Sequence, residues 1–172
     1  MSGGSFTGPA AANDPGQKGK LELLKKGKVG SFLNVIGVKE ITNLQKIAIK
    51  ETRLGIPLLF ALDVIHGYKT IFPIPLAEAC SWDLNGAELT ASIAAKEASA
   101  AGLNWTFAPM MDISRDPRWG RVMEGAGEDP YLGSQFAAAR VRGFQGELSD
   151  NEHLMACVKH FAAYGAPEAG RE

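Results

Sequence analysis

The chain has 172 residues, a formal net charge of −1 and 45% hydrophobic residues, which is the length of one ordinary domain and the composition of a globular protein. The near-neutral charge argues against binding to nucleic acid or to an anionic membrane surface, because both call for an excess of basic residues. No apolar stretch approaches the length of a membrane span.

Residues 1–19 are rich in Gly, Ala, Ser and Pro, and this composition predicts an irregular lead-in to a folded domain over residues 20–172. The lead-in has neither the basic nor the apolar region of a signal peptide, so either the chain is cytoplasmic or its native N-terminus is missing. The basic stretch around Leu21–Leu24 is then expected to form a helix that ends near Gly27.

From there the sequence alternates between short apolar runs and stretches with helical spacing. The predicted strands and helices are residues 29–35 (strand), 38–54 (helix), 56–64 (strand), 84–101 (helix), 105–113 (strand), 131–144 (helix) and 154–163 (strand). This alternation predicts parallel βα units. The strands are apolar without alternation, which indicates a sheet buried on both faces.

A closed barrel and an open doubly wound sheet both fit this pattern. No glycine-rich nucleotide-binding motif is present, so a nucleotide-binding sheet has no support. Charged residues recur at the predicted strand ends, namely Asp63, Asp112 and Lys159 with His160, and in barrels that end carries the active site. A complete barrel typically needs about 250 residues, so we expect an α/β fold that is a partial (β/α)₈ barrel holding only early-to-middle units.

Asp63 ends an apolar run. A carboxylate there either accepts two sugar hydroxyls, or caps the next helix or pairs with a nearby base. A lone histidine in an apolar strand is usually a satisfied core residue, but His160 follows Lys159 directly. A buried ammonium requires partners, which Asp63 or Glu124 is placed to supply.

The segment 112–121 holds three arginines and two aspartates. For Arg115 and Arg118 we expect ordinary surface ion pairs or structural pairs with the local aspartates. Trp119 next to Arg121 has a different interpretation. An exposed aromatic ring beside a fork of hydrogen-bond donors suits a sugar, which packs its apolar face on the ring and offers hydroxyls to the donors.

The segment 124–130 has the glycines of a phosphate-binding loop, but its acidic residues would repel a phosphate. A turn is expected instead, with Asp129 as the N-cap of the next helix and Pro130 in its first position.

Cys80 and Cys157 are expected to be buried free thiols, although a disulfide between them stays open. The three histidines lack the spacing of a metal site, so no metal or cofactor is expected.

At these residues the sequence resembles glycoside hydrolase family 3, and most closely the bacterial periplasmic β-glucosidases of that family. The matching segments are PLLFALDVIHG (57–67), FPIPLAEACSW (72–82), LNWTFAPMMDISRDPRWGR (103–121), EGAGEDPYL (124–132) and VKHFAAYGAPEAGRE (158–172). The likeness implies a (β/α)₈-like N-terminal domain and hydrolysis of O-glycosyl bonds that releases terminal β-D-glucosyl residues. It also implies a β-glucoside or oligosaccharide substrate and a periplasmic or extracellular location.

The resemblance assigns roles to matched positions only. Asp63 matches an aspartate that binds the outer hydroxyls of the terminal sugar, and Arg121 the arginine beside it. Lys159 and His160 match the pair on the other side of the sugar, and Glu124 a supporting acid. With Trp119 these residues form the expected substrate-binding set.

The catalytic groups are expected outside this chain. The family's aspartate nucleophile lies on a later strand and its acid/base carboxylate usually lies in a second domain, while Phe6–Gly8 resembles the tail of the first barrel strand. We therefore expect a fragment that recognises sugar, is inactive alone, and has the missing C-terminal part of its own chain as its partner.

Two further activities within the family are alternatives, those of β-xylosidases and β-N-acetylhexosaminidases. The latter carry a second histidine shortly after the Lys-His pair, where this chain has Ala163-Tyr164-Gly165, so the glucosidase branch is favoured. Outside this function there are two alternatives, a non-catalytic sugar-binding module and an unrelated small α/β enzyme. The module is disfavoured because an open half-barrel leaves strand edges and apolar surface uncovered.

Overall fold

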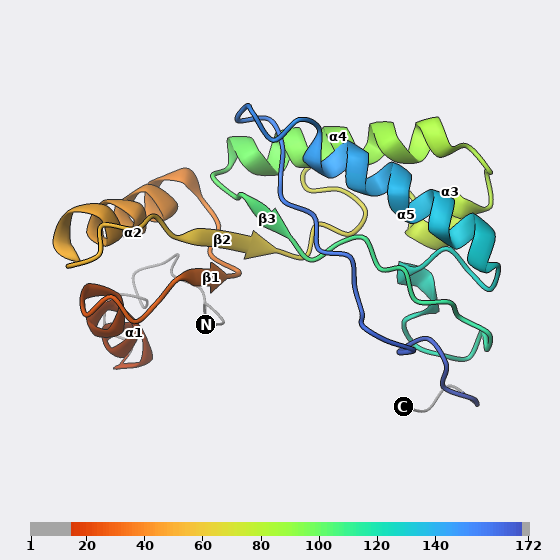
Figure 1. Ribbon diagram of the computed structural model, residues 1–172, viewed down its shortest axis with the longest axis horizontal. Helices are drawn as coiled ribbons and strands as arrows, with labels where there is room; N and C mark the ends of the chain where they lie inside the picture. Colours follow the sequence, from red (N-terminus) through yellow and green to blue (C-terminus); the bar gives the residue numbers. More distant parts are fainter. Residues whose placement is uncertain (1–14, 170–172) are drawn as a thin grey trace. The chain divides into compact units, whose positions relative to one another are not determined.

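The structure is a computed structural model that describes residues 15–169 (Figure 1). The helices and strands are α1 (Pro15–Lys25), β1 (Ser31–Leu33), α2 (Val38–Glu51), β2 (Leu59–Leu62), α3 (Pro75–Ala79), α4 (Leu84–Ala100), β3 (Trp105–Thr106), the 3₁₀ turn η2 (Val122–Glu124) and α5 (Pro130–Gln145). The three strands form one parallel sheet in the order β1-β2-β3. The expected α/β class is therefore confirmed.

The chain divides into two compact units, and the first comprises Met1–Leu62 with Ala100–Trp105. Strands β1 and β2 pair in parallel, with Phe32 opposite Phe60. These two fully buried rings stack with centroids 6.1 Å apart. Gln45 of α2 bonds both backbone groups of Leu58 through its side-chain amide. The side-chain oxygen of Asn104 accepts from the amide of Phe60, and the backbone amide of Asn104 donates to the Phe60 carbonyl. Gln45 thus fixes where β2 begins, and Asn104 fixes the chain before β3 beside it.

The second unit comprises Asp63–Ser99 and Thr106–Glu172. Helix α4 is rich in alanine, and its buried residues are all alanines, which allows close packing. Helix α5 lies beside it (Figure 1). At Gly143 an added Cβ would lie 2.2 Å from the carbonyl oxygen of Glu88 and 2.8 Å from the Cβ of Ala91. Only glycine permits this approach of the two helices.

The last predicted strand, residues 154–163, is not formed as a regular strand, and β3 is shorter than the predicted 105–113. Backbone hydrogen bonds nevertheless align residues 155–159 with 106–111, since Cys157 donates to Ala108 and Met111 donates to Lys159. Met110 and Lys159 form a parallel bridge. Pro109 has no N–H to extend a ladder, and the amide of Ala156 donates to the side chain of Gln145 instead of to a strand.

Other local expectations were partly wrong. Helix α1 begins at Pro15, within the range expected to be irregular, because proline is well suited to the first turn of a helix. Residues 1–14, which include the strand tail expected at Phe6–Gly8, lie outside the described residues. Helix α3 was not predicted, since five residues show no readable period. Both cysteines are free as expected, but Cys80 is exposed and Cys157 half-buried, so their expected burial is wrong.

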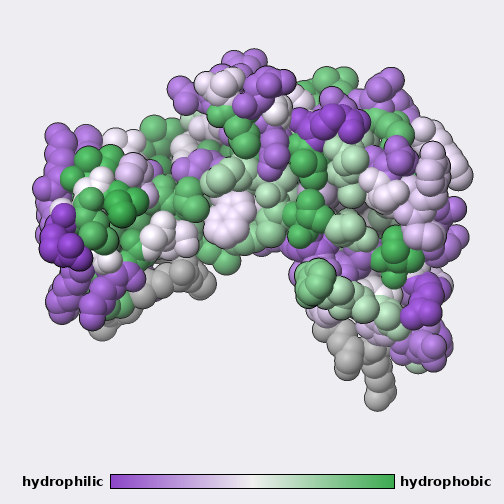
Figure 2. Space-filling view, in the orientation of Figure 1, coloured by the Kyte–Doolittle hydropathy of each residue, from purple (hydrophilic) through white to green (hydrophobic). Residues whose placement is uncertain are grey.

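The surface mixes the two kinds of residue, and Figure 2 shows hydrophobic groups in green among hydrophilic groups in purple. Among the described residues, the most exposed large hydrophobic side chains are Phe161, Tyr131, Trp82 and Ile71. Within residues 15–169, no helix combines the length and the apolar character that crossing a membrane would take.

The N-cap of α5 gives a test of local stability. The Asp129 carboxylate accepts from the amides of Tyr131 and Leu132 at 2.8 and 2.9 Å, as expected from the sequence. Asp129→Ala should lower the free energy of unfolding by about 0.5–2 kcal/mol, measured by denaturant titration. Glu128→Ala, an exposed acid next to it, is the control and should change the value by less than about 0.5 kcal/mol. Equal losses from both variants would contradict the cap.

Candidate functional site

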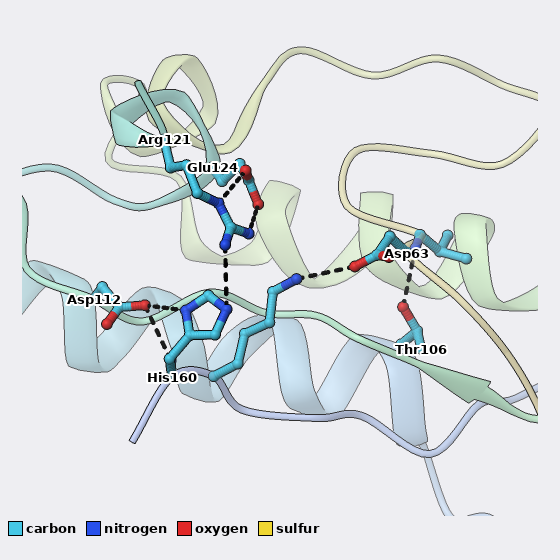
Figure 3. A network of polar contacts seen from close by, with 8 residues as sticks. Asp63, Thr106, Asp112, Arg121, Glu124 and His160 are labelled. Atoms are coloured by element: carbon cyan, nitrogen blue, oxygen red, sulfur yellow. Dashed lines mark hydrogen bonds and ion pairs between the residues drawn. The ribbon is translucent and has the colours of Figure 1, made fainter. Parts of the chain in front are cut away.

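Asp63 and Lys159 form an ion pair at the ends of two strand segments that lie on either side of residues 105–111. Asp63 directly follows β2, and Lys159 ends the segment aligned with residues 106–111. The Lys159 Nζ donates to the Asp63 Oδ1 at 3.0 Å (Figure 3). The lysine side chain is only 12% exposed while that of the aspartate is 46% exposed. The cation is therefore held by a carboxylate that still faces solvent, which is one of the two partners that the sequence offered for it.

Two hydrogen bonds anchor His160 to Asp112, a residue that is 6% exposed. The Asp112 Oδ2 accepts from the His160 backbone amide at 3.0 Å and lies 2.8 Å from the ring Nδ1. The ring Nε2 lies 3.4 Å from an Nη of Arg121. Because arginine only donates, this arrangement assigns the proton to Nδ1 and makes Nε2 the acceptor.

Arg121 and Glu124 face each other across the 3₁₀ turn η2. The guanidinium makes a two-pronged contact with the carboxylate, with both N–O distances 2.7 Å. This hydrogen bonding lowers the pKa of Glu124, and the nearby charge of Lys159 acts in the same direction. It also raises the pKa of Arg121. Glu124 is therefore an acceptor that stays charged, and Figure 3 shows the pair pointing toward His160.

Tyr164 joins the cluster through its ring, although the sequence gave no reason to select it. The ring contacts His160 edge-on at 4.7 Å and lies 5.4 Å from the guanidinium carbon of Arg121. It also packs edge-on against Trp119 at 5.4 Å. Trp119 itself is 2% exposed, so the expectation of an exposed aromatic platform is wrong. One contact that covers the indole is the ring of Tyr164, a residue far away in the sequence.

Asp112 is the second residue that sequence reasoning missed as part of the site. Its place at a strand end was visible, but nothing in the spacing indicated that it would face His160. Gly165 makes the closure possible, because an added Cβ there would lie 2.5 Å from the carbonyl oxygen of Ile113. The return of the chain after His160 thus packs directly on the segment that carries Asp112.

Of the two other arginines in the 112–121 segment, Arg118 forms the expected ion pair and Arg115 does not. Arg118 pairs with Asp116 at 2.6 Å with most of its side chain exposed, and this contact holds the pKa of Asp116 far below its ordinary value. The structure gives no ion pair for Arg115, which lies at the exposed surface. Within residues 15–169, no group of three or more His, Cys, Asp or Glu side chains is arranged to hold a metal.

The cluster has the character of a site for a polyhydroxylated, neutral ligand. Asp63 and Glu124 supply acceptors, while Lys159 and Arg121 supply donors, and each of these charges already has a partner of opposite sign. A ligand with many hydroxyl groups can exchange hydrogen bonds with such groups without bringing a net charge.

The lowered pKa of Glu124 makes the stability of the cluster depend on pH. Its contribution is present above the ordinary value of 4.5 and is lost as the pH falls through the depressed folded-state value. The difference in unfolding free energy between the wild type and Glu124→Gln should therefore be largest near neutral pH and shrink below about pH 4.5. Denaturant titrations across this range measure it. Glu147→Gln, at an exposed position, is the control and should change the unfolding free energy by less than about 0.5 kcal/mol. A difference for Glu124→Gln that stays the same across this pH range would contradict the lowered pKa of Glu124.

Comparison with known proteins identifies the family of this chain. The sequence model described as "Glycosyl hydrolase family 3 N terminal domain" matches residues 13–172. A periplasmic β-glucosidase of Salmonella typhimurium is 47% identical over 152 residues, which is 88% of this chain and 20% of that protein.

Solved structures give the same picture. The β-glucosidase of Listeria innocua in complex with glucose is 48% identical, with a TM-score of 0.83 over 90% of this chain and 23% of that one. A mutant of that enzyme in complex with laminaribiose is 46% identical, with a TM-score of 0.87 over 96% of this chain and 24% of that one. This chain spans about a fifth to a quarter of the length of these relatives. It belongs to glycoside hydrolase family 3, in the N-terminal domain of that family.

Proposed function

We propose that this chain provides the sugar-recognition part of the active site of a retaining β-glucosidase, which releases terminal β-D-glucosyl residues. The observation that carries the proposal is the cluster at the strand ends, where Asp63, Lys159, His160, Arg121 and Glu124 meet. Family membership and the likeness to β-glucosidases support the reaction class.

The roles of the individual groups follow from their geometry. Asp63 keeps its carboxylate half exposed while it pairs with Lys159, so the carboxylate can accept hydrogen bonds from the hydroxyl groups of a sugar. Lys159 and Arg121 donate to hydroxyl oxygens from two sides. Asp112 holds the His160 ring in place, and Trp119, which is buried against Tyr164, is not available to stack on the sugar.

The chemistry itself requires a second set of groups. A retaining glycosidase uses two carboxyl groups about 5–5.5 Å apart, one as the nucleophile and one as the acid/base. Every carboxylate of the cluster is engaged with a cation or with His160, which suits binding better than nucleophilic attack. We propose that both catalytic carboxylates belong to parts of the relatives that this chain does not match.

The fold proposal extends the observed sheet. Parallel strands with helices between them, and site residues gathered at the strand ends, support the early-to-middle units of a (β/α)₈ barrel over residues 20–172. In that arrangement the βα loops after β2 and β3 carry Asp63 and Arg121.

A chimaera tests the sugar-binding role of Asp63. Residues 13–172 replace the matching segment of the Listeria innocua enzyme, and turnover of an aryl β-glucoside is measured. Asp63→Ala removes a charged acceptor worth roughly 1.5–3 kcal/mol, so kcat/KM should fall roughly ten- to hundredfold.

Lys69→Ala is the matched control, because Lys69 is an exposed residue of the loop after Asp63, and it should leave kcat/KM within about twofold. Equal, small effects from the two variants would overturn the assignment of Asp63. A chimaera that folds but hydrolyses no β-glucoside would overturn the proposed function.

The separation of binding from chemistry has its own test. The 172-residue protein alone should give no sustained turnover of an aryl β-glucoside above the rate of the buffer. Enzyme-dependent turnover that is lost in Asp63→Ala would show that the chain carries its own catalytic carboxylates, contrary to the proposal.

A further inference from the structure

Arg140 is the most deeply buried cationic residue among those the structure describes. It lies in α5 and is 2% exposed, with its guanidinium carbon 5.8 Å from the ring centre of Phe136 and 5.3 Å from that of Phe144. Burial lowers the pKa of Arg140, while the charge of Glu78 opposes that change. A cation in such a place requires specific partners.

The first partner is Glu78 of α3, also buried, whose Oε2 accepts from one Nη at 2.5 Å. The other carboxylate oxygen of Glu78 has no hydrogen-bond partner among the described residues. A pair with one oxygen unsatisfied is a poor source of stability, since removing two charges from water costs more than an incomplete pair returns. Stability alone therefore does not account for this pair.

The second partner lies in the main chain next to the site. The other Nη of Arg140 donates to the carbonyl oxygen of Ile65, two residues after Asp63. Val64, which lies between Asp63 and Ile65, is held as well. Its amide donates to the hydroxyl of Thr106 at 3.2 Å, and both groups are buried. The backbone just after Asp63 is thus held from two sides, by Arg140 and by Thr106.

We propose that Arg140 is a positioning residue, which Glu78 orients so that its guanidinium fixes the main chain after Asp63 and hence the carboxylate that pairs with Lys159. The reason is geometric: the guanidinium is a rigid fork, with one prong on α3 and the other on Ile65. The consequence for sugar affinity rests on the proposed function, but the positioning of residues 63–66 does not.

The test replaces both members of the pair, because removing Arg140 alone leaves a buried, unpaired carboxylate that endangers folding. The variant E78L/R140M puts apolar groups of similar size in both places, which is often neutral for stability, yet it removes the hydrogen bond to Ile65. The control is E88L/R142M, which makes the same change in an exposed pair between α4 and α5.

Three measurements are made on the full chain: a thermal melt, hydrogen exchange of the Val64 amide, and titration with glucose. In E78L/R140M we expect a cooperative melt, Val64 exchange at least tenfold faster than in the wild type, and glucose affinity at least tenfold weaker. The control should match the wild type in exchange and affinity. If E78L/R140M does not fold, the exchange of the Val64 amide is measured in R140K instead. Lysine keeps the charge but not the fork of donors, so Val64 should again exchange at least tenfold faster than in the wild type.

Unchanged Val64 exchange in a folded variant would overturn the proposal and leave Arg140 a purely structural residue. Faster exchange with no binding of glucose by any chain, wild type included, would support the positioning role and count against the proposed function. Faster exchange with unchanged affinity for glucose would overturn the link from Arg140 to the sugar site.

Discussion

Charges withdrawn from water must be paired, and this constraint organises the second unit of the chain. Lys159 is largely buried and is held by Asp63; the buried Asp112 is matched by His160; and Arg140, the most buried cation, is matched by Glu78. Each pair joins segments that are far apart in the sequence. An unpaired member would cost several kcal/mol, so the pairs determine which segments meet as well as what the site can bind.

The pairs differ in what they leave available. Asp63 keeps its carboxylate half exposed, and Arg121 and Glu124 are partly exposed, so these groups can exchange hydrogen bonds with a ligand. Asp112 and Glu78 are covered and act through their partners. The cluster therefore has an accessible layer that suits a hydroxyl-rich ligand and a covered layer that fixes its geometry, and this division agrees with membership of a glycosidase family.

The sequence was most informative where a local rule applies. Helices α2, α4 and α5 follow from apolar spacing, and the cap at Asp129 follows from its position before a proline. The parallel class follows from the alternation of apolar runs with helical stretches. The charges at strand ends left Asp63 and Glu124 as partners for Lys159, and the structure shows the pair with Asp63. Long-range packing was not readable in the same way: Trp119 is buried because Tyr164 covers it, and no local pattern connects residues so far apart. The irregular course of residues 154–163 depends likewise on partners elsewhere, such as Gln145.

The family likeness suggested roles that spacing alone left open. For Asp63, for example, spacing did not distinguish a helix cap from a residue that binds sugar. It did not indicate Asp112, Tyr164 or Arg140, whose roles are visible only from their contacts in the structure.

We propose above all that the cluster of Asp63, Lys159, His160 and Arg121 binds a sugar. A crystal structure of the chain grown with glucose tests it most directly. We expect sugar hydroxyls within hydrogen-bond distance of the Asp63 carboxylate and the Lys159 Nζ. Glucose bound only elsewhere, or an empty cluster at saturating glucose, would contradict the sugar-binding role of the cluster.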